Sequence, residues 1–333
     1  CTSLKILIIQ TAFIGDVILA TALVEKLSAF YPESKIDFLL RKGNESILAN
    51  NPHINEILIW DKRNQKYKNW WKLLFKIRKG KYDIVINVQR FLSTGLLTAF
   101  SRGKETIGFE KNPLSFLFTH RVKHIIGTKE KPVHEVERNH RLIRDLTDEK
   151  VTKPKIYPSE KDFQKVKTEG KYVTISPASV WFTKQLPAKK WLEVIALVPK
   201  ECTVYLVGGK EDHELCQQIL EASGRNDLIN LSGQLTLLES AALMKNAAMN
   251  FVNDSAPLHL ASSVNAPVTA VFCSTIPAFG FGPLSDKSFV AETKLELSCR
   301  PCGLHGFHAC PKKHFLCSEI DAQEIVKSLL SGN

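Results

Sequence analysis

Short apolar runs alternate with stretches of helix-spaced apolar residues along the sequence, and this alternation constrains the fold more than any other feature. A strand–helix alternation of this kind produces parallel sheets with helices on both faces. The expected strands lie at 4–9, 35–40, 56–60, 83–88, 106–109, 172–176, 203–207, 228–230, 249–252 and 268–272. The expected helices lie near 16–30, 43–50, 66–79, 92–101, 135–147, 189–198, 211–223, 236–246 and 256–264. The sequence therefore predicts an α/β protein.

The alternation is interrupted once, in the polar stretch from Thr147 to Glu160, which contains Pro154 and Pro158. A chain of 333 residues is long enough for two domains, each with its own core. We predict two Rossmann-like, doubly wound domains, residues 1–155 and residues 156–333. The C-terminal helix is expected to pack on the second domain or to return onto the first.

The composition indicates a globular protein with an anionic partner. The apolar fraction is 44%, the charged fraction is 24%, and the net charge is +11. A charge of this sign suits a nucleotide, a phosphorylated glycan, a nucleic acid or a membrane surface. No apolar run approaches the ~20 residues of a membrane span. The first run is too short for a signal peptide and leads into a βα unit, so we expect a cytoplasmic protein.

Gly15 and Asp16 lie where the first expected strand gives way to a helix. This is the carboxyl end of a strand, where open α/β sheets bind their ligands. Asp16 has two interpretations here. It either caps the helix, since a carboxylate accepts backbone N–H bonds and complements the positive end of the dipole, or it acts on a bound ligand.

A turn of related design follows the expected strand 249–252. Asp254 and Ser255 are predicted to cap the next helix, and Pro257 falls in its first turn. A helix N-terminus presents free N–H groups that suit a diphosphate. His259 lies four residues after Ser255 on the same helical face. The alternative is a well-capped helix with an incidental histidine.

Two further turns follow strands of the second half. Ser179, Thr183 and Lys184 offer donors and a cation to phosphate oxygens, or else form a solvated loop. In Val207-Gly-Gly-Lys-Glu211 the glycines allow a close backbone approach, and Glu211 suits a ribose hydroxyl. Neither G-x-x-x-x-G-K-[ST] nor G-x-G-x-x-G occurs, which argues against P-loop and dinucleotide-binding proteins.

Taken in order, these motifs resemble those of the bacterial ADP-heptose:lipopolysaccharide heptosyltransferases, glycosyltransferase family 9, and more closely the second-heptose branch. The resemblance covers nearly the whole chain. The matching segments are Ile14-Gly-Asp16, Thr106-Ile-Gly-Phe-Glu110, His134-Glu-Val-Glu-Arg-Asn139, the Lys184 loop ending at Pro187, Gly208-Gly-Lys-Glu211 and Asn253-Asp-Ser-x-x-x-His259.

The resemblance implies a GT-B fold, with two Rossmann-like domains facing across a cleft. The N-terminal domain would bind a lipid-anchored anionic glycan acceptor and the C-terminal domain the nucleotide sugar. The reaction would be an inverting, metal-independent transfer of heptose from ADP-heptose to the inner core of lipopolysaccharide. Asp16 matches the catalytic base, which takes the proton of the acceptor hydroxyl. Lys184 would neutralise charge on the departing diphosphate.

The residues that the resemblance assigns to the donor site are Gly15, Ser179, Thr183, Lys184, Glu211, Asp254, Ser255, Ala256 and His259. Two departures from the family pattern bear on sugar specificity: Ala256 replaces the usual glycine, and the stretch from Lys184 to Pro187 reads Lys-Gln-Leu-Pro. One alternative is a GT-B enzyme for another nucleotide sugar. A non-catalytic protein that binds nucleotides or nucleic acid ranks below both, and we expect no nucleic-acid partner.

Four cysteines cluster near the C-terminus: Cys299, Cys302, Cys310 and Cys317. Together with His305, His308 and His314 they offer tetrahedral zinc ligands, although a second C-x-x-C is missing. Reduced thiols are the favoured alternative, and a disulfide ranks below both in a cytoplasmic chain. We expect no cofactor to be required for catalysis.

The segment 66–79 is both basic and aromatic. Lys72, Lys76 and Lys79 share one helical face, with Trp71, Leu74, Phe75 and Ile77 broadly opposite. The favoured interpretation is a helix packed on the N-terminal sheet. A second interpretation adds contact of its cationic face with anionic lipid at the inner face of the inner membrane. Basic residues of the N-terminal half suited to the acceptor are Arg90, Arg102, Lys104, Lys111 and Arg121.

Overall fold

The computed structural model describes residues 3–330 and divides into two compact units. The first contains residues up to 127 together with 133–157, and the second contains 128–132 and the chain from 158 onward. The main division thus falls two residues from the expected boundary. The sequence did not indicate that 128–132 belongs with the second unit.

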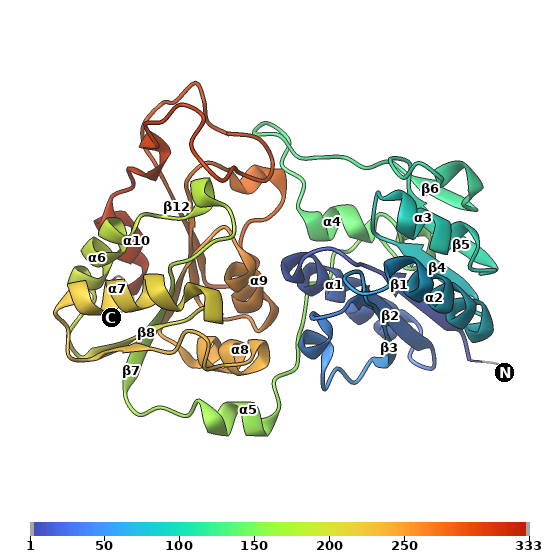
Figure 1. The fold of residues 1–333 in the computed structure, drawn as a ribbon, viewed down its shortest axis with the longest axis horizontal. Coiled ribbons are helices and arrows are strands. Elements are labelled where there is room, and N and C mark those ends of the chain that lie inside the picture. The colour runs from blue at the N-terminus through green and yellow to red at the C-terminus, as the bar shows by residue number, and fades with distance from the viewer. Residues whose placement is uncertain (1–2, 331–333) are drawn as a thin grey trace. The chain divides into compact units, whose positions relative to one another are not determined.

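The first unit is a six-stranded sheet with helices on both faces (Figure 1). Its elements are β1 (Lys5–Ile9), α1 (Ile14–Phe30), β2 (Lys35–Arg41), β3 (Ile54–Trp60), α2 (Lys66–Gly80), β4 (Ile84–Asn87), α3 (Leu92–Ala99), β5 (Glu105–Phe109), β6 (His120–Val122) and α4 (Glu135–His140). The strand order is β3-β2-β1-β4-β5-β6, and neighbouring strands pair in parallel. This is the Rossmann order, in which the winding reverses between β1 and β4.

The second unit repeats this architecture. Its elements are α5 (Glu160–Lys165), β7 (Lys171–Ser176), α6 (Ala188–Leu197), β8 (Cys202–Leu206), α7 (His213–Ser223), β9 (Leu228–Asn230), α8 (Leu237–Asn246), β10 (Met249–Asn253), α9 (Ala256–Ser263), β11 (Val268–Phe272), β12 (Ser288–Glu292) and α10 (Ala322–Leu330). The order β12-β11-β10-β7-β8-β9 is again parallel and again the Rossmann order, with the reversal between β7 and β10.

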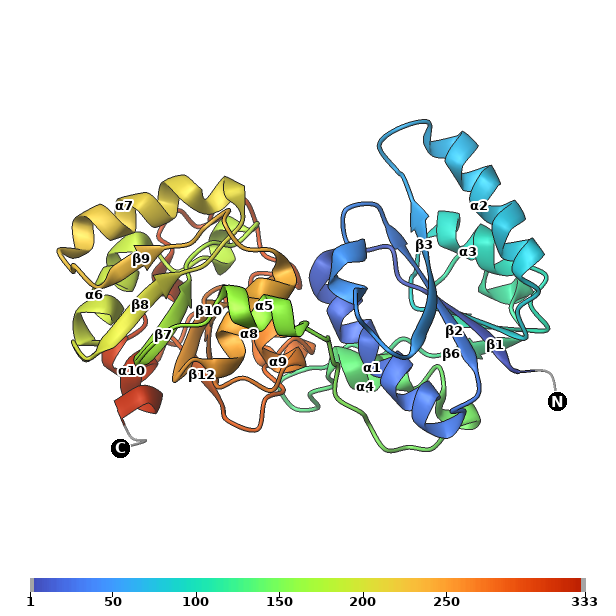
Figure 2. The ribbon, with the colours of Figure 1, turned by 90° about the horizontal axis from the view of Figure 1, so that it is seen from below.

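Helices cover both faces of each sheet (Figure 2). In the first unit α2 and α3 share one apolar core on one face, whereas α1 contacts α4 on the other. In the second unit α6, α7 and α10 share one core, and α5 and α8 share another. Buried Ile325, Val326 and Leu329 fix α10 against this second sheet. The last helix thus packs within the second unit, as the first of the two expectations for it has it.

The other differences from the sequence prediction are local. The expected helix at 43–50 is a 3-10 turn over Glu45–Leu48, and the one at 135–147 ends as an α-helix at His140. Strands β6 and β12 and helix α5 were not predicted. On α2 the buried side chains are Leu73, Leu74 and Ile77, and Trp71 and Phe75 are exposed. The prediction that those two rings pack on the sheet is thus wrong.

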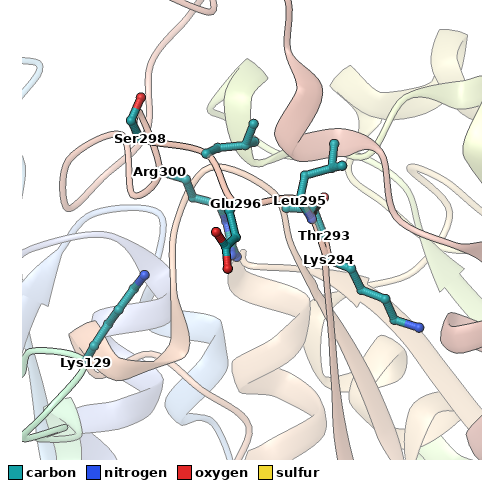
Figure 3. Close-up of a pocket in the computed structure, with 8 residues that line it drawn as sticks. Lys129, Thr293, Lys294, Leu295, Glu296, Ser298 and Arg300 are labelled. Carbon is teal, nitrogen blue, oxygen red and sulfur yellow. Dashed lines mark hydrogen bonds between the residues drawn. The ribbon is translucent and has the colours of Figure 1, made fainter.

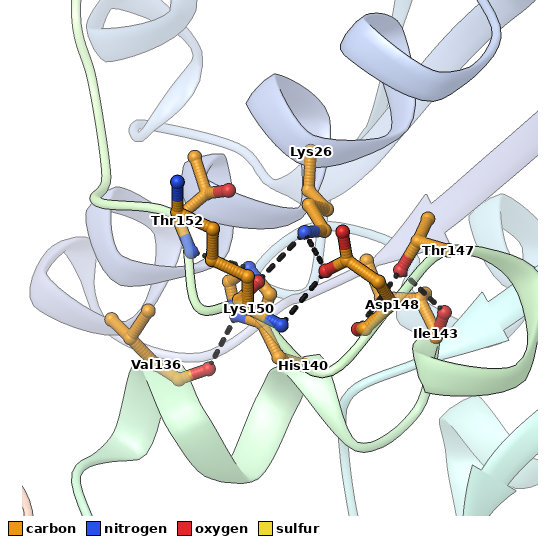
Figure 4. A network of polar contacts seen from close by, with 8 residues as sticks. All are labelled: Lys26, Val136, His140, Ile143, Thr147, Asp148, Lys150 and Thr152. Carbon is orange, nitrogen blue, oxygen red and sulfur yellow. Dashed lines mark hydrogen bonds and ion pairs between the residues drawn. The ribbon is translucent and has the colours of Figure 1, made fainter.

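The polar stretch expected to be a linker is fastened to two helices of the first unit (Figure 4). Lys26 of α1, 4% exposed, forms an ion pair with Asp148 and donates to the carbonyl of Lys150 at 2.7 Å. His140 of α4 donates from Nδ1 to the carbonyl of Val136 at 2.7 Å. Its Nε2 accepts the backbone N–H of Thr152 at 3.0 Å. These bonds require a neutral imidazole, because a proton on Nε2 would face the N–H of Thr152.

His140 makes the stability of the protein depend on pH. Burial lowers the pKa of His140 below 6.5. Between that lowered pKa and about 6.5 the unfolded chain binds a proton that the folded protein does not, so stability falls as the pH falls through this window. We expect the free energy of unfolding of the wild type to decrease below pH 6.5 by up to about 1.4 kcal/mol per pH unit more than that of His140→Gln. Urea titrations at several pH values measure both slopes, and parallel slopes would contradict the assignment.

Candidate active site

The reversal between β7 and β10 brings together two loops of the second unit that the sequence singled out. Lys184 follows β7 and Asp254 follows β10, and their Nζ and Oδ2 atoms lie 2.8 Å apart. Both side chains are largely buried, at 12% and 4% exposed. The hydroxyl of Thr275 donates to the same Oδ2 at 2.6 Å. Asp254 thus holds the Lys184 ammonium at the carboxyl edge of the sheet, where Rossmann-like domains bind ligands.

Helix α9 begins beside this ion pair. Its N-cap is Ser255 and Pro257 lies in its first turn, but the Ser255 side chain forms no capping bond. Within the described residues, Ser255 Oγ is buried and has no hydrogen-bond partner. The prediction that Asp254 and Ser255 cap α9 is therefore wrong, since Asp254 is held by Lys184 and Thr275. The first turn presents its amide groups next to a hydroxyl and an ammonium, which suits an anionic ligand.

His259 lies one turn further along α9. It is 5% exposed, and its ring centroid is 6.2 Å from that of Phe281. Ala256 is the first residue of the helix. The structure thus gathers Lys184, Asp254, Ser255, Ala256 and His259 in one region of the second unit.

Thr183 has a role that the sequence did not indicate. Its side chain is 1% exposed and its hydroxyl accepts bonds from the N–H of Phe307 (2.8 Å) and from Ser274 Oγ (3.0 Å). Its own N–H donates to the carbonyl of Phe307 at 3.1 Å. The Thr183 hydroxyl therefore joins the Lys184 loop to the cysteine-rich segment. Ser179 is half-buried, and its N–H donates to Gln185 Oε1 at 3.0 Å.

Gly306 of that segment lies directly against the Lys184 loop. Its φ is +76°, and a Cβ added there would lie 3.1 Å from Lys184 Cγ and 3.1 Å from Thr183 Oγ1. Trp181 and His308 stack nearby, with ring centroids 4.7 Å apart. The absence of a side chain at Gly306 lets the segment rest on the aliphatic stem of Lys184.

The Gly208-Gly209 turn follows β8. The N–H of Gly209 donates to Asp212 Oδ2 at 2.7 Å, and a Cβ at Gly208 would lie 2.8 Å from the Asp212 side chain. Burial raises the pKa of Asp212. The acid that stabilises the turn is thus Asp212, which the sequence analysis did not single out. Glu211 is exposed beside it.

In the first unit, Asp16 is the third residue of α1, whose N-cap is Phe13 without a side-chain bond. Asp16 is therefore not the N-cap residue, although its charge still complements the first turn of the helix. Gly15 precedes Asp16, and both residues are half-buried.

The sequence analysis missed other polar groups at the carboxyl edge of the first sheet. Thr11 follows β1 and Gln89 follows β4, and the Thr11 hydroxyl donates to Gln89 Oε1 at 2.6 Å across the reversal of winding. Lys62 follows β3 and donates to the Thr11 carbonyl at 2.9 Å and to Thr11 Oγ1 at 3.0 Å. The only feature of the sequence that could have indicated these three residues is their position directly after apolar runs.

Basic residues gather at the carboxyl edge of the first sheet. Burial, Arg41 and Lys66 lower the pKa of Lys62 to about 8. Burial, together with the charges of Arg138, Arg90 and Lys111, lowers the pKa of His124 to about 4. Burial is the larger cause of both shifts, and the neighbouring cations add to it; the gathering of those cations suits an anionic ligand at this edge.

Among the basic residues expected near the acceptor, Arg90 and Lys111 follow β4 and β5 and lie at this edge. Arg102 and Lys104 precede β5 and lie at the opposite edge, where Lys104 pairs with Asp83 at 2.7 Å. Arg121 lies on β6. Arg102 and Lys104 are thus separated from Arg90 and Lys111, because position before a strand places a residue at the amino edge.

The cysteines of the described chain are free thiols, including Cys299, Cys302, Cys310 and Cys317. Cys302 Sγ donates to the carbonyl of Cys299, and Cys299 Sγ lies 3.8 Å from His314 Nε2. Residues 3–330 contain no group of three or more His, Cys, Asp or Glu side chains placed to hold a metal ion. The structural-zinc alternative at these cysteines has no ligand geometry to support it.

A cavity of about 680 Å³ lies after β12 (Figure 3), and neither Lys184 nor Asp254 is among the residues that line it. Its lining includes Arg300, whose guanidinium donates to the carbonyls of Phe272, Cys273 and Thr275 and to Glu292. Arg300 therefore supports the loop after β11. None of the expected site residues lines this cavity.

The family model described as "Glycosyltransferase family 9 (heptosyltransferase)" matches residues 70–304 of the chain. The chain belongs to this family. It is therefore a glycosyltransferase, as the motifs predicted. A curated relative, lipopolysaccharide heptosyltransferase 3 of Escherichia coli, is 27% identical over 279 residues, which cover 79% of this chain and 82% of the relative.

Solved structures of the family share the fold. The E. coli ADP-heptose lipopolysaccharide heptosyltransferase II superposes with a TM-score of 0.80 at 22% identity, covering 98% of both chains. The E. coli heptosyltransferase WaaC with ADP-2-deoxy-2-fluoro heptose gives a TM-score of 0.74 at 17% identity, covering 98% of this chain and 99% of that one. The predicted α/β fold of the GT-B type, with two Rossmann-like parallel sheets, is confirmed. None of the helices within residues 3–330 has the length and apolarity to cross a bilayer.

The contact between Gly306 and Lys184 gives a test of the candidate site. In Gly306→Ala the new methyl group presses on the Lys184 stem, so we expect turnover to fall about 10-fold or more. Gly303→Ala is the matched control, because Gly303 also has a positive φ (+82°) but its nearest neighbour would be 3.7 Å away. Both variants bear a similar backbone strain of about 1 kcal/mol. Steady-state transfer assays at equal folded fraction measure the difference, and equal activities would show that Gly306 does not position Lys184.

Proposed function

We propose that this protein transfers heptose from ADP-heptose, with inversion at the anomeric carbon, to the inner core of lipopolysaccharide. The observation that carries the proposal is the Lys184–Asp254 ion pair at the N-terminus of α9, within a chain of glycosyltransferase family 9. An ammonium, a serine hydroxyl and the amides of a helix N-terminus form a donor set suited to a sugar diphosphate. The relatives named for heptosyl transfer to lipopolysaccharide support the acceptor class.

In this mechanism Asp16 is the general base. Its carboxylate takes the proton of the acceptor hydroxyl as that oxygen attacks the anomeric carbon. The bond from the anomeric carbon to the diphosphate oxygen breaks, and ADP leaves carrying the electron pair. Lys184 and the first turn of α9 stabilise the negative charge that develops on the leaving phosphate. No metal ion takes part in the proposed steps.

The remaining assignments complete the donor site. Ser179, Ser255, Ala256 and His259 lie beside the sugar diphosphate, and exposed Glu211 binds the ribose or the sugar. Thr183 positions the loop that carries Lys184, because its hydroxyl already accepts hydrogen bonds from Phe307 and Ser274. Gly15 allows the donor to approach the turn before Asp16.

The first unit binds the acceptor in this proposal. The cations crowded around Lys62 and His124 suit the carboxylates and phosphates of an anionic glycan. The glycan is lipid-anchored, so the enzyme works on the cytoplasmic side, at the inner face of the inner membrane. The acceptor for the second heptose is the one to assay first. The acceptors for the first heptose and for the third heptose are assayed beside it.

A donor screen tests this function directly. We expect purified protein to transfer sugar from ADP-heptose to a heptose-deficient inner-core acceptor, and to act at least about 100-fold more slowly with UDP-, GDP- or CMP-sugars. Mass spectrometry of the acceptor measures the added heptose. Preference for a donor without adenine would overturn the substrate assignment and favour a GT-B enzyme for another nucleotide sugar.

Substitutions separate the base from the donor contact. Asp16→Asn should lower kcat about 10²–10⁴-fold and leave ADP affinity nearly unchanged, because the amide cannot accept the proton. Glu160→Gln, which removes a first-turn carboxylate of α5, is the control for the loss of helix-dipole stabilisation. Kinetics and ADP titration calorimetry measure both effects. Retained turnover in Asp16→Asn would refute its assignment as the base.

Lys184→Gln should lower kcat about 10²–10³-fold and weaken donor binding. It also leaves the buried Asp254 carboxylate without its partner, which destabilises the fold. The double variant Lys184→Gln/Asp254→Asn removes both charges, so it should recover stability and not turnover. Recovery of turnover in the double variant would show that Lys184 acts only on folding.

A further inference from the structure

The solvent face of α2 carries a row of exposed aromatic rings. Tyr67, Trp71 and Phe75 are spaced by four residues and are 78%, 55% and 62% exposed. We call these three residues the aromatic stripe. They lie away from Leu73, Leu74 and Ile77, which fix the helix to the sheet. Single exposed apolar residues are common on protein surfaces, but contiguous exposed apolar residues are not. Three adjacent exposed rings therefore indicate a surface that binds a partner or a membrane.

A row of lysines runs beside the aromatic stripe. Lys68, Lys72 and Lys76 each follow one ring of the stripe by one residue, and Lys79 continues the row. The helix contains six lysines and arginines and no acidic residue. Lys76 pairs with Glu56 of β3 at 2.5 Å, whereas Lys68, Lys72 and Lys79 form no ion pair within residues 3–330. The outer face of α2 is thus half aromatic and half cationic.

The apolar side of this face continues onto α3. The indole N–H of Trp70 donates to the carbonyl of Ser93 at 3.0 Å, and Arg78 Nε donates to that of Phe100 at 2.7 Å. These bonds hold the two helices side by side, as Figure 2 shows. At the ends of α3 the exposed side chains are Phe91 (60%), Leu92 (53%) and Phe100 (45%).

We propose that this α2–α3 face docks on the surface of an anionic lipid bilayer. Tyrosine and tryptophan favour the bilayer interface, where the ring is buried and its polar edge stays hydrated. Lysines beside the rings reach anionic headgroups, each adding to the affinity. An amphipathic helix with this division lies in the plane of the interface and needs no spanning segment.

The charge of the face argues against two other occupants. A second copy of the chain would bring two acid-free, cationic helices together, and their repulsion opposes association. Single-stranded nucleic acid binds along basic grooves lined with stacking rings, whereas this face is the outer surface of a helix. The docking proposal rests on the proposed function in one respect: the lipid-anchored acceptor explains why the acceptor-binding unit would carry such a face.

Sedimentation of the full-length protein with vesicles tests the docking. We expect binding to vesicles of phosphatidylethanolamine and phosphatidylglycerol (about 3:1), weak binding to phosphatidylcholine, and loss of binding as salt increases. Lys68→Gln/Lys72→Gln/Lys79→Gln should weaken binding roughly 100-fold. Tyr67→Ser/Trp71→Ser/Phe75→Ser should weaken it at least about 10-fold, because interfacial burial of three rings is lost. The matched control Lys161→Gln/Lys167→Gln/Lys200→Gln removes the same charge from exposed positions of the second unit and should bind nearly as the wild type does.

The outcomes separate docking from catalysis, because vesicle binding needs neither donor nor acceptor. Both α2 variants should retain the kcat of the wild type on a water-soluble, delipidated acceptor, and their KM should rise only for acceptor in anionic vesicles. Equal vesicle binding by the wild type and the aromatic variant would overturn the proposal. So would a lipid-free dimer in analytical ultracentrifugation that the same substitutions dissociate, since it would assign the face to a second copy. Absence of transfer to any acceptor, with vesicle binding intact, would instead refute the proposed function alone.

Discussion

The order of the strands is the constraint on which both candidate sites depend. In each unit the winding reverses at one pair of neighbouring strands, β1 with β4 and β7 with β10, so the loops after those strands diverge and leave room at the carboxyl edge. In the second unit that place holds the Lys184–Asp254 pair at 2.8 Å, and in the first it holds the Thr11–Gln89 bond at 2.6 Å. Residues about 70–80 positions apart meet there only because the sheet order makes their strands neighbours.

The two edges attract anions by different means. In the second unit the cation is already neutralised by Asp254, so a diphosphate must share or replace that carboxylate and gain the amides of α9. In the first unit cations gather around Lys62 and His124, and their repulsion adds to the burial that chiefly lowers the pKa of each group. An anionic ligand there relieves an unfavourable charge cluster. A single compact diphosphate suits the second edge, and several dispersed acidic groups suit the first.

The sequence predicted the elements best where burial is continuous and failed where it is not. Strand β10 is buried throughout and β1 is buried after its first residue, and both were predicted within a residue at each end. Strand β6 reads His-Arg-Val at the edge of its sheet and gave no signal. On α2 the sequence grouped Trp71 and Phe75 with Leu74 and Ile77. Only Leu74 and Ile77 of that group, together with Leu73, are buried against the sheet. The sequence could place Lys184 and Asp254 after strands. It could not predict their ion pair, because that depends on which strands are neighbours.

The cysteine-rich segment also acquires its role from packing that the sequence could not show. Residues 298–315 contain no helix or strand, and a stretch of that length is uncommon in a compact domain without a function of its own. Its order comes from backbone bonds to the Lys184 loop, through Thr183 and Phe307, and to the loop after β11, where the N–H of Cys302 donates to Ser274. Burial raises the pKa of Cys317 to about 11, so this thiol stays protonated and packs as a small apolar side chain in the core. The segment thereby supports the stem of Lys184, and Gly306, rather than any of its thiols, is the residue that lies against the candidate site.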